Sequence, residues 1–181
     1  MTDYPIEQCC FATGHRSMPQ HQRRNILLRI RLICLTLMEK GVRHFYVGGA
    51  NGFDQWVAVA VIKLRELDPT LTLHVLLPDK DYTWQFSPEE KLLQEDILSQ
   101  ADEVVTVPAR GGREPALVRD DELVRRGAYC ICYLRDHNLT RRGGTAYTLR
   151  RAREANRICY SVFSAEDYNL PAADAGREEK V

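Results

Sequence analysis

FYVGGANGFDQW, residues 45–56, is the stretch that decides the fold of this chain. Its first three residues form a short apolar run without helical period, which predicts a strand. Glycines at positions 48, 49 and 52 then allow a tight turn, and helical periodicity begins at Phe53. A strand that passes through a glycine turn straight into a helix is the building unit of a parallel α/β sheet.

The same strand, turn and helix order occurs at two other places in the sequence. Thr13-Gly14-His15-Arg16 follows an earlier apolar run, and Gly143-Gly144-Thr145 precedes the last strong helix. A glycine-bearing turn at such a junction exposes backbone N–H groups beside the positive end of the helix dipole. Each turn is therefore a candidate site for phosphate or another anion.

Strands and helices alternate along most of the chain. Apolar runs predict strands at 6–12, 45–47, 72–77, 104–107, 128–134 and 158–163, and helical periodicity predicts helices at 22–40, 53–67, 88–100, about 116–126 and 145–156. This order predicts an α/β fold, a single three-layer domain whose mostly parallel sheet has helices on both faces. In such a sheet the ligand crevice lies at the carboxyl ends of the strands, where all three turns fall.

Length and composition fit one globular domain. The chain has 181 residues, of which 44% are hydrophobic and 28% charged, so we expect one domain over residues 1–164. Residues 165–181 are acidic, alanine-rich and without periodicity, which predicts a disordered tail. The 25 basic and 25 acidic residues balance, so a nucleic-acid partner is not expected.

The sequence predicts a cytoplasmic protein without a membrane span, a metal site or a familiar hydrolase motif. No apolar run is long enough to cross a bilayer, and the first residues do not form a signal peptide. The H-E-x-x-H, G-x-S-x-G and P-loop signatures are missing. Because no C-x-x-C pair occurs and most cysteines lie in apolar runs, we expect reduced, buried, structural thiols. The cysteines are Cys9, Cys10, Cys34, Cys130, Cys132 and Cys159.

The first turn combines three kinds of anion-binding group. The hydroxyl of Thr13, the backbone of Gly14 and the guanidinium of Arg16 together suit one phosphate. His15 lies among them as a further candidate contact. The alternative is a plain turn in which His15 caps local backbone.

In the second turn, Gly48, Gly49, Ala50 and Gly52 are candidate phosphate contacts, because their backbone permits close approach of a ligand. Asp54 either caps the helix that follows or meets a ribose hydroxyl.

In the third turn, Thr145 either caps its helix or binds phosphate together with Gly143 and Gly144. Arg141 and Arg142 flank this turn and either neutralise a bound charge or are simply solvated. Tyr82 and Trp84 follow the third strand and either stack on a base or pack beneath their loop.

Together these residues resemble the YpsA-like proteins of the SLOG superfamily, the Rossmann-like group that also contains the LOG phosphoribohydrolases and the DprA/Smf proteins. The resemblance extends from about Cys9 to Phe163 and is carried by the Thr-Gly-His-Arg turn, residues 48–56 and Gly143-Gly144-Thr145. It implies a bacterial, cytoplasmic protein with a pocket for ligands such as ADP-ribose, NAD-related molecules or nucleoside phosphates. It also adds Arg119 to the candidate contacts, although this chain has Arg-Asp at 119–120 where the family commonly has Arg-Asn.

The LOG enzymes carry a Gly-Gly-x-Gly-Thr-x-x-Glu pattern whose glutamate takes part in cleaving an N-glycosidic bond, and Thr148 stands at that position here. A hydroxyl cannot supply the carboxylate that such acid–base chemistry requires. The sequence therefore favours binding or sensing of a nucleotide-derived ligand. A nucleotide N-glycosidase using Asp54 or Glu122 is the alternative, and a DprA-like DNA-associated protein is the third hypothesis. Long amphipathic helices leave a homo-oligomer open.

Overall fold

A computed structural model of the chain describes residues 3–18, 22–134 and 142–162. The strands are β1 (Cys9–Gly14), β2 (His44–Val47), β3 (Thr72–Pro78), β4 (Glu103–Val107), β5 (Tyr129–Tyr133) and β6 (Ile158–Ser161). They form one sheet in the order β4-β3-β2-β1-β5-β6, and every neighbouring pair is parallel. The predicted α/β fold is confirmed, with a sheet that is parallel throughout.

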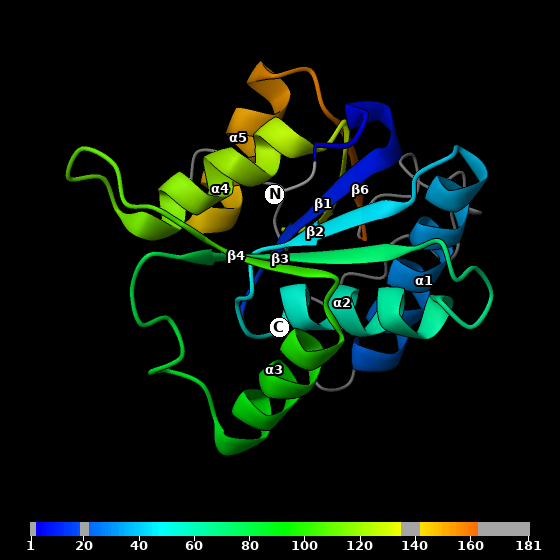
Figure 1. Ribbon diagram of the computed structural model, residues 1–181, viewed down its shortest axis with the longest axis horizontal. Helices are drawn as coiled ribbons and strands as arrows, with labels where there is room; N and C mark the ends of the chain where they lie inside the picture. The colour runs from blue at the N-terminus through cyan, green and yellow to red at the C-terminus, as the bar shows by residue number, and fades with distance from the viewer. Residues whose placement is uncertain (1–2, 19–21, 135–141, 163–181) are drawn as a thin grey trace.

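Helices cover both faces of this sheet. They are α1 (Arg23–Glu39), α2 (Phe53–Leu64), α3 (Pro88–Gln100), α4 (Pro115–Arg126) and α5 (Gly144–Glu154). Figure 1 shows α1, α2 and α3 below the sheet and α4 and α5 above it. The first three crossovers add strands on one side of β1, and the chain then crosses to its other side to form β5. The strand order therefore reverses between β1 and β5, which is where open α/β sheets hold their ligands.

Both ends of the first strand differ from the sequence-based expectation. The first strand begins at Cys9 rather than at residue 6, because Ile6–Gln8 forms a short 3-10 turn in which the Gln8 N–H donates to the Pro5 carbonyl at 2.9 Å. The strand also continues into the first half of the predicted turn and ends at Gly14, so that Thr13 pairs with Cys132 and Gly14 with Tyr133. The first turn is thus anchored in the middle of the sheet. Phe163 and the tail at 165–181 lie outside the described residues.

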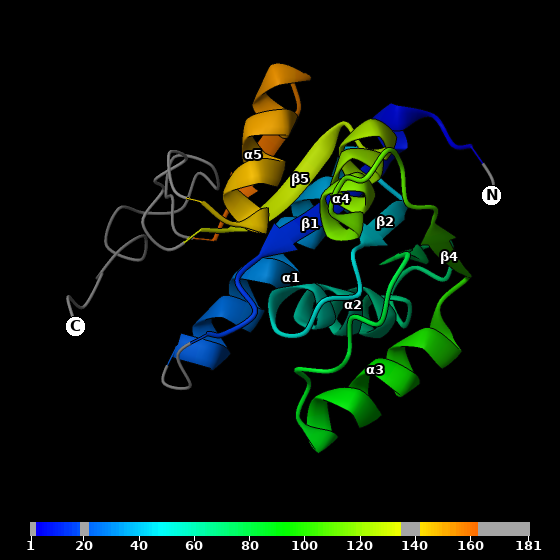
Figure 2. The same ribbon diagram turned by 90° about the vertical axis from the view of Figure 1, so that its left-hand side faces the viewer.

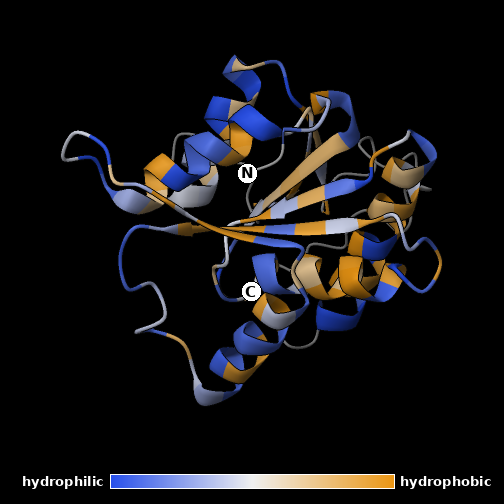
Figure 3. Cartoon of the chain, in the orientation of Figure 1, coloured by the Kyte–Doolittle hydropathy of each residue, from blue (hydrophilic) through white to orange (hydrophobic). Residues whose placement is uncertain are grey.

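Alternating side chains of the strands build a separate core on each face of the sheet. In β1, Cys10 and Ala12 pack on the side of α1 and α2, while Cys9 and Phe11 pack on the side of α4 and α5. Each large apolar side chain buried in this way stabilises the fold by about 1.5–3 kcal/mol. In Figure 3 the hydrophobic segments gather on the strands and on the helices where they meet the sheet.

The cysteines contribute to the cores as thiols. All six are free, and five of them are buried, as predicted. Burial raises the pKa of Cys34 to about 12 and that of Cys9 to about 11, so both thiols stay protonated. Among the described residues, no helix is both long and apolar enough to cross a bilayer.

Candidate ligand-binding cleft

A cleft of about 420 Å³ lies where the strand order reverses, at the carboxyl ends of β1 and β5. In Figure 2, α4 and α5 lie on one side of β1 and β5, and α1 and α2 on the other. The predicted site residues that line the cleft come from all three turns and from α4. They are Thr13, Gly14, His15, Arg16, Ala50, Asp54, Arg119, Gly143, Gly144 and Thr145, together with Arg142.

The first turn is pressed against the start of α2. A Cβ atom at Gly14 would lie 2.4 Å from the ring of Phe53, so only glycine fits there. The N–H of Phe53 donates to the His15 carbonyl at 3.2 Å, and the His15 ring meets Tyr133 edge-on at 5.6 Å. The guanidinium of Arg16 points toward the loop after β3, where it donates to Oε1 of Gln85 at 2.9 Å.

The second turn is closed by its own carboxylate. Oδ2 of the buried Asp54 accepts hydrogen bonds from the N–H of Gly48 at 3.0 Å and of Ala50 at 3.4 Å. These two N–H groups, predicted as phosphate contacts, are therefore occupied by a side chain of the same turn. Gly48, Gly49 and Gly52 lie outside the lining of the cleft, and the turn brings Asp54 to its wall.

Arg119 ties α4 to this turn. Its buried side chain donates from Nε to Oδ1 of Asp120 at 2.8 Å and from its terminal nitrogen to the carbonyl of Gly48. Burial raises the pKa of Asp54 to about 6, an effect that the charge of Arg119 opposes and that of Asp120 reinforces. The cleft wall thus holds two carboxylates beside one buried guanidinium.

The third turn leaves the beginning of α5 open. Gly143 precedes the helix with a φ of 143°, a conformation that favours glycine, and among the described residues no side chain caps the helix there. The first N–H groups of an α-helix have no partner within the helix, so they are available to a ligand. Thr145 is predicted either to cap the helix or to bind phosphate, and within the described part of the chain the N-cap position is held by Gly143 instead.

Thr148 and Asp120 form a pair that the sequence analysis missed. The fully buried hydroxyl of Thr148 lies 3.0 Å from Oδ2 of Asp120 and 2.8 Å from the carbonyl of Gly144. Position 148 therefore presents no carboxylate of its own, but it contacts one from α4. The signal was the unusual Arg-Asp at 119–120, which places a carboxylate among the candidate contacts.

Besides Gly48, Gly49 and Gly52, three further predicted residues do not line the cleft. Glu122 is on α4 but is bound to Arg125 at 2.7 Å and to Arg126 at 2.9 Å. Trp84 is 69% exposed on the loop after β3. The ring of Tyr82 meets that of Phe86 edge-on, with the ring centroids 5.9 Å apart. This contact agrees with the alternative that Tyr82 packs beneath its loop. Arg141 lies outside the described residues.

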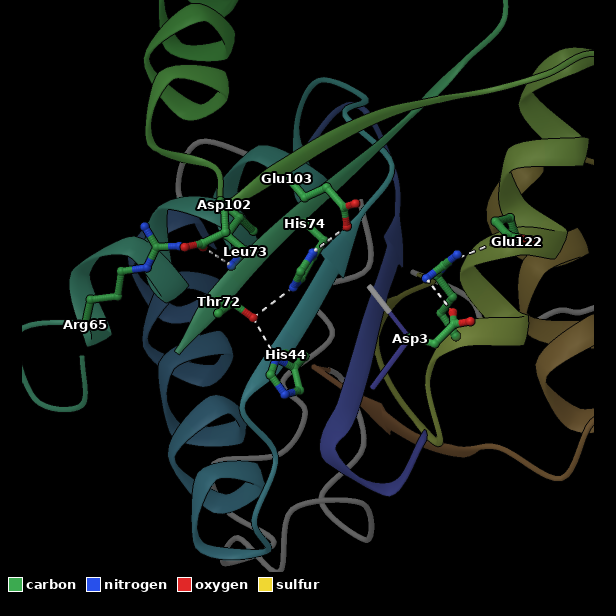
Figure 4. Close-up of polar contacts among 10 residues, drawn as sticks. Asp3, His44, Arg65, Thr72, Leu73, His74, Asp102, Glu103 and Glu122 are labelled. Atoms are coloured by element: carbon green, nitrogen blue, oxygen red, sulfur yellow. Dashed lines mark hydrogen bonds and ion pairs between the residues drawn. The ribbon is translucent and has the colours of Figure 1, made fainter. Parts of the chain in front are cut away.

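A second polar cluster occupies the opposite, amino-terminal end of the sheet (Figure 4). The Thr72 hydroxyl bridges Nδ1 of His44 at 2.7 Å and Nε2 of His74 at 2.8 Å, and Nδ1 of His74 lies 3.2 Å from Glu103. Tyr4 stacks on His44 with ring centroids 3.5 Å apart, which holds the segment before β1 against this cluster. In the part of the chain that the structure describes, no group of three or more His, Cys, Asp or Glu side chains is placed to hold a metal ion.

The all-parallel sheet with its cleft at the strand-order reversal defines a Rossmann-like protein. The family model YpsA, whose description is "YspA SLOG family", matches residues 14–164. The chain belongs to the YpsA family of SLOG proteins.

Curated relatives carry only a family designation. A UPF0398 protein of Halalkalibacterium halodurans is 37% identical over 87 residues, covering 47% of this chain and 45% of that protein. UPF0398 proteins of Bacillus pumilus and Lactobacillus delbrueckii subsp. bulgaricus are each 36% identical, over 80 and 86 residues, covering 44% and 45% of this chain and 43% and 46% of those proteins. The chain thus spans less than half the length of the curated relatives that it matches.

Proposed function

We propose that the cleft between β1 and β5 binds a phosphorylated, nucleotide-derived ligand and that the chain acts as a binding or sensing module. The observation that carries the proposal is the beginning of α5, which no side chain of the described residues caps and which lines the same cleft as the end of β1. Free N–H groups and the positive end of a helix dipole form an anion site. Arg142 lines the cleft next to them and adds positive charge.

The two turns on the β1 and β2 side supply different parts of the proposed site. Thr13 and Gly14 end β1 in the cleft and present a hydroxyl and backbone to a phosphate. The second turn acts through Asp54, because the carboxylate already occupies the N–H groups of Gly48 and Ala50. A carboxylate at the cleft wall can accept hydrogen bonds that the hydroxyls of a ribose donate.

The class of ligand follows from the chemistry of the cleft together with the family. ADP-ribose, NAD-related molecules and nucleoside phosphates all combine phosphate with ribose, which the proposed anion site and the Asp54 carboxylate suit. Ligands of this class and six free thiols both fit the cytoplasm, which we propose as the location.

Thermal unfolding with added AMP, ADP-ribose or NAD tests binding. A ligand at 100 times its Kd should stabilise the folded chain by about 2.7 kcal/mol. We expect Arg142→Ala to weaken this stabilisation, while Arg153→Ala should leave it unchanged because Arg153 is exposed on α5 outside the cleft lining. The absence of stabilisation by all three compounds would refute the proposal.

Hydrolysis of the N-glycosidic bond is a second candidate, favoured by the Asp120 carboxylate that Thr148 and Arg119 hold in the cleft. In this reaction water adds its oxygen to the anomeric carbon, the bond from carbon to base nitrogen breaks, and a proton goes to the leaving base. Asp120 would accept the proton of the water, and Asp54, whose pKa of about 6 lets it carry a proton near neutral pH, would donate one.

Chromatography of AMP incubated with the protein separates the two candidates. Release of adenine by the wild-type chain, lost in Asp120→Asn but retained in the exposed variant Glu95→Gln, would establish hydrolysis. Binding of AMP without release of adenine would leave the chain a binding module.

A further inference from the structure

A second cavity of about 460 Å³ adjoins the cleft on the side of α2 and α3. Arg16 lines both cavities, while every other lining residue belongs to one of them. The boundary between them is tight, since a Cβ atom at Gly52 would lie 2.1 Å from the Arg16 carbonyl oxygen. A ligand that occupied both cavities would therefore pass across Arg16.

The walls of the second cavity combine an aromatic platform with charged groups of both signs. The guanidinium of Arg23 lies 5.1 Å from the centre of the Trp56 ring. Arg16 reaches the same cavity through its hydrogen bond to Gln85, and Glu89 and Glu90 also line it. Aromatic rings and guanidinium planes are the surfaces on which bases stack, and carboxylates accept hydrogen bonds from sugar hydroxyls.

Asn51 adds an acceptor that the folded chain does not use. Its Nδ2 donates to Oε1 of Glu90 at 2.9 Å, which fixes the orientation of the side-chain amide. Its Oδ1 is buried and has no hydrogen-bond partner among the described residues. A buried acceptor without a donor costs the fold free energy, and a ligand hydroxyl or amino group in this cavity would relieve that cost.

We infer that the second cavity is a subsite for the second sugar or nucleoside arm of a two-armed ligand whose linking diphosphate contacts Arg16. The inference rests on the proposed binding of a nucleotide-derived ligand in the first cleft. Each cavity alone falls in the range of about 300–1,000 Å³ that is usual for small-molecule sites, so the pair accommodates more than a mononucleotide. The preferred ligand is thus of the dinucleotide or nucleoside-diphosphate-sugar class.

Isothermal titration with AMP and with ADP-ribose tests this assignment on the full chain. AMP fills only the first cleft, whereas ADP-ribose reaches both cavities. We expect ADP-ribose to bind at least about tenfold more tightly than AMP, because the second arm adds stacking and hydrogen bonds. Arg23→Ala and Glu89→Gln alter exposed residues that line the second cavity and not the first, so the fold should not change.

Both variants should weaken binding of ADP-ribose by roughly threefold to tenfold and leave binding of AMP unchanged. Arg24→Ala is the matched control, since Arg24 is exposed beside Arg23 and lines neither cavity. The second subsite would be overturned if the wild type bound the two compounds with equal affinity, or if the variants weakened the binding of both compounds or of neither. Binding of AMP would still support the proposed function in that case. A wild-type chain that bound neither AMP nor ADP-ribose would overturn the second subsite, and a failure to bind NAD as well would overturn the proposed function.

Discussion

Nε of Arg119 donates to Oδ1 of Asp120 at 2.8 Å, and both side chains are buried at the wall of the cleft. The same guanidinium reaches the carbonyl of Gly48, next to the Asp54 carboxylate. One arginine on α4 therefore joins the second turn to the carboxylate that contacts α5. The cleft depends on this connection, because the elements that form it come from distant parts of the sequence.

Arg119→Met should strongly destabilise the chain, because it leaves two buried carboxylates without their cation. Removing one partner of a buried ion pair typically costs about 3–5 kcal/mol. Urea denaturation measures this loss in the free energy of unfolding. Arg125→Met is the control on the same helix, where the exposed pair with Glu122 contributes less than about 1 kcal/mol. Similar losses in the two variants would contradict the role of Arg119.

Asp54 should make the chain less stable as the pH rises toward neutrality. Its pKa rises from 3.8 to about 6 on folding, so between these values the folded chain binds a proton that the unfolded chain has released. The associated stability is complete below pH 3.8 and is lost as the pH rises through about 6. Between pH 5 and pH 8 the wild type should lose about 1 kcal/mol relative to Asp54→Asn. If the free energies of unfolding of the wild type and Asp54→Asn changed in parallel with pH, this titration of Asp54 would be excluded.

His44 should have the opposite effect to Asp54, because it should make the chain less stable as the pH falls. Burial lowers its pKa from 6.5 to about 4, and the charges of His74 and Arg43 add to this shift while Asp102 opposes it. The stability that depends on neutral His44 is complete above pH 6.5 and is lost as the pH falls through about 4. We expect the wild type to lose about 1–2 kcal/mol between pH 7.5 and pH 5 relative to His44→Gln. Thermal unfolding at the two pH values measures this loss of stability. Equal acid sensitivity of the wild type and His44→Gln would disprove the role of His44.

Gly52→Ala should disrupt the contact between the first and second turns. Gly52 has a φ of +79°, and an added Cβ would lie 2.1 Å from a backbone oxygen of Arg16 that cannot move aside. Gly111 also has a positive φ, of +55°, but its surroundings are open within 4 Å, so Gly111→Ala is the matched control. Gly111→Ala should cost about 1 kcal/mol, and Gly52→Ala at least about 2 kcal/mol more. Equal losses of stability in Gly52→Ala and Gly111→Ala would show that the close contact between the first and second turns is not needed for stability.

The fold could be predicted from the sequence because its local signals agree. Apolar runs, helical periodicity and glycine turns each indicate the same alternation, and the helix expected at 88–100 forms over those residues. The first strand was harder to delimit, because Thr13 and Gly14 look like turn residues although β5 pairs with both. Pairing with a distant strand decided the boundary there.

The candidate site could be predicted in outline but not in its internal contacts. The glycine turns indicated the end of the sheet at which the cleft lies. The sequence could not show that Asp54 occupies the N–H groups of Gly48 and Ala50, since a carboxylate near a turn serves equally as a helix cap. The Arg-Asp at 119–120 indicated a carboxylate among the candidate contacts, but the contact between Thr148 and Asp120 could not be predicted, because it depends on how α4 packs against α5.

A crystal structure of the chain grown with AMP tests the central claim most directly. The account predicts phosphate density between the end of β1 and the beginning of α5, within reach of Gly14, Thr145 and Arg142. Density for AMP at any other place, or a cleft without AMP at a concentration well above the measured Kd, would contradict it.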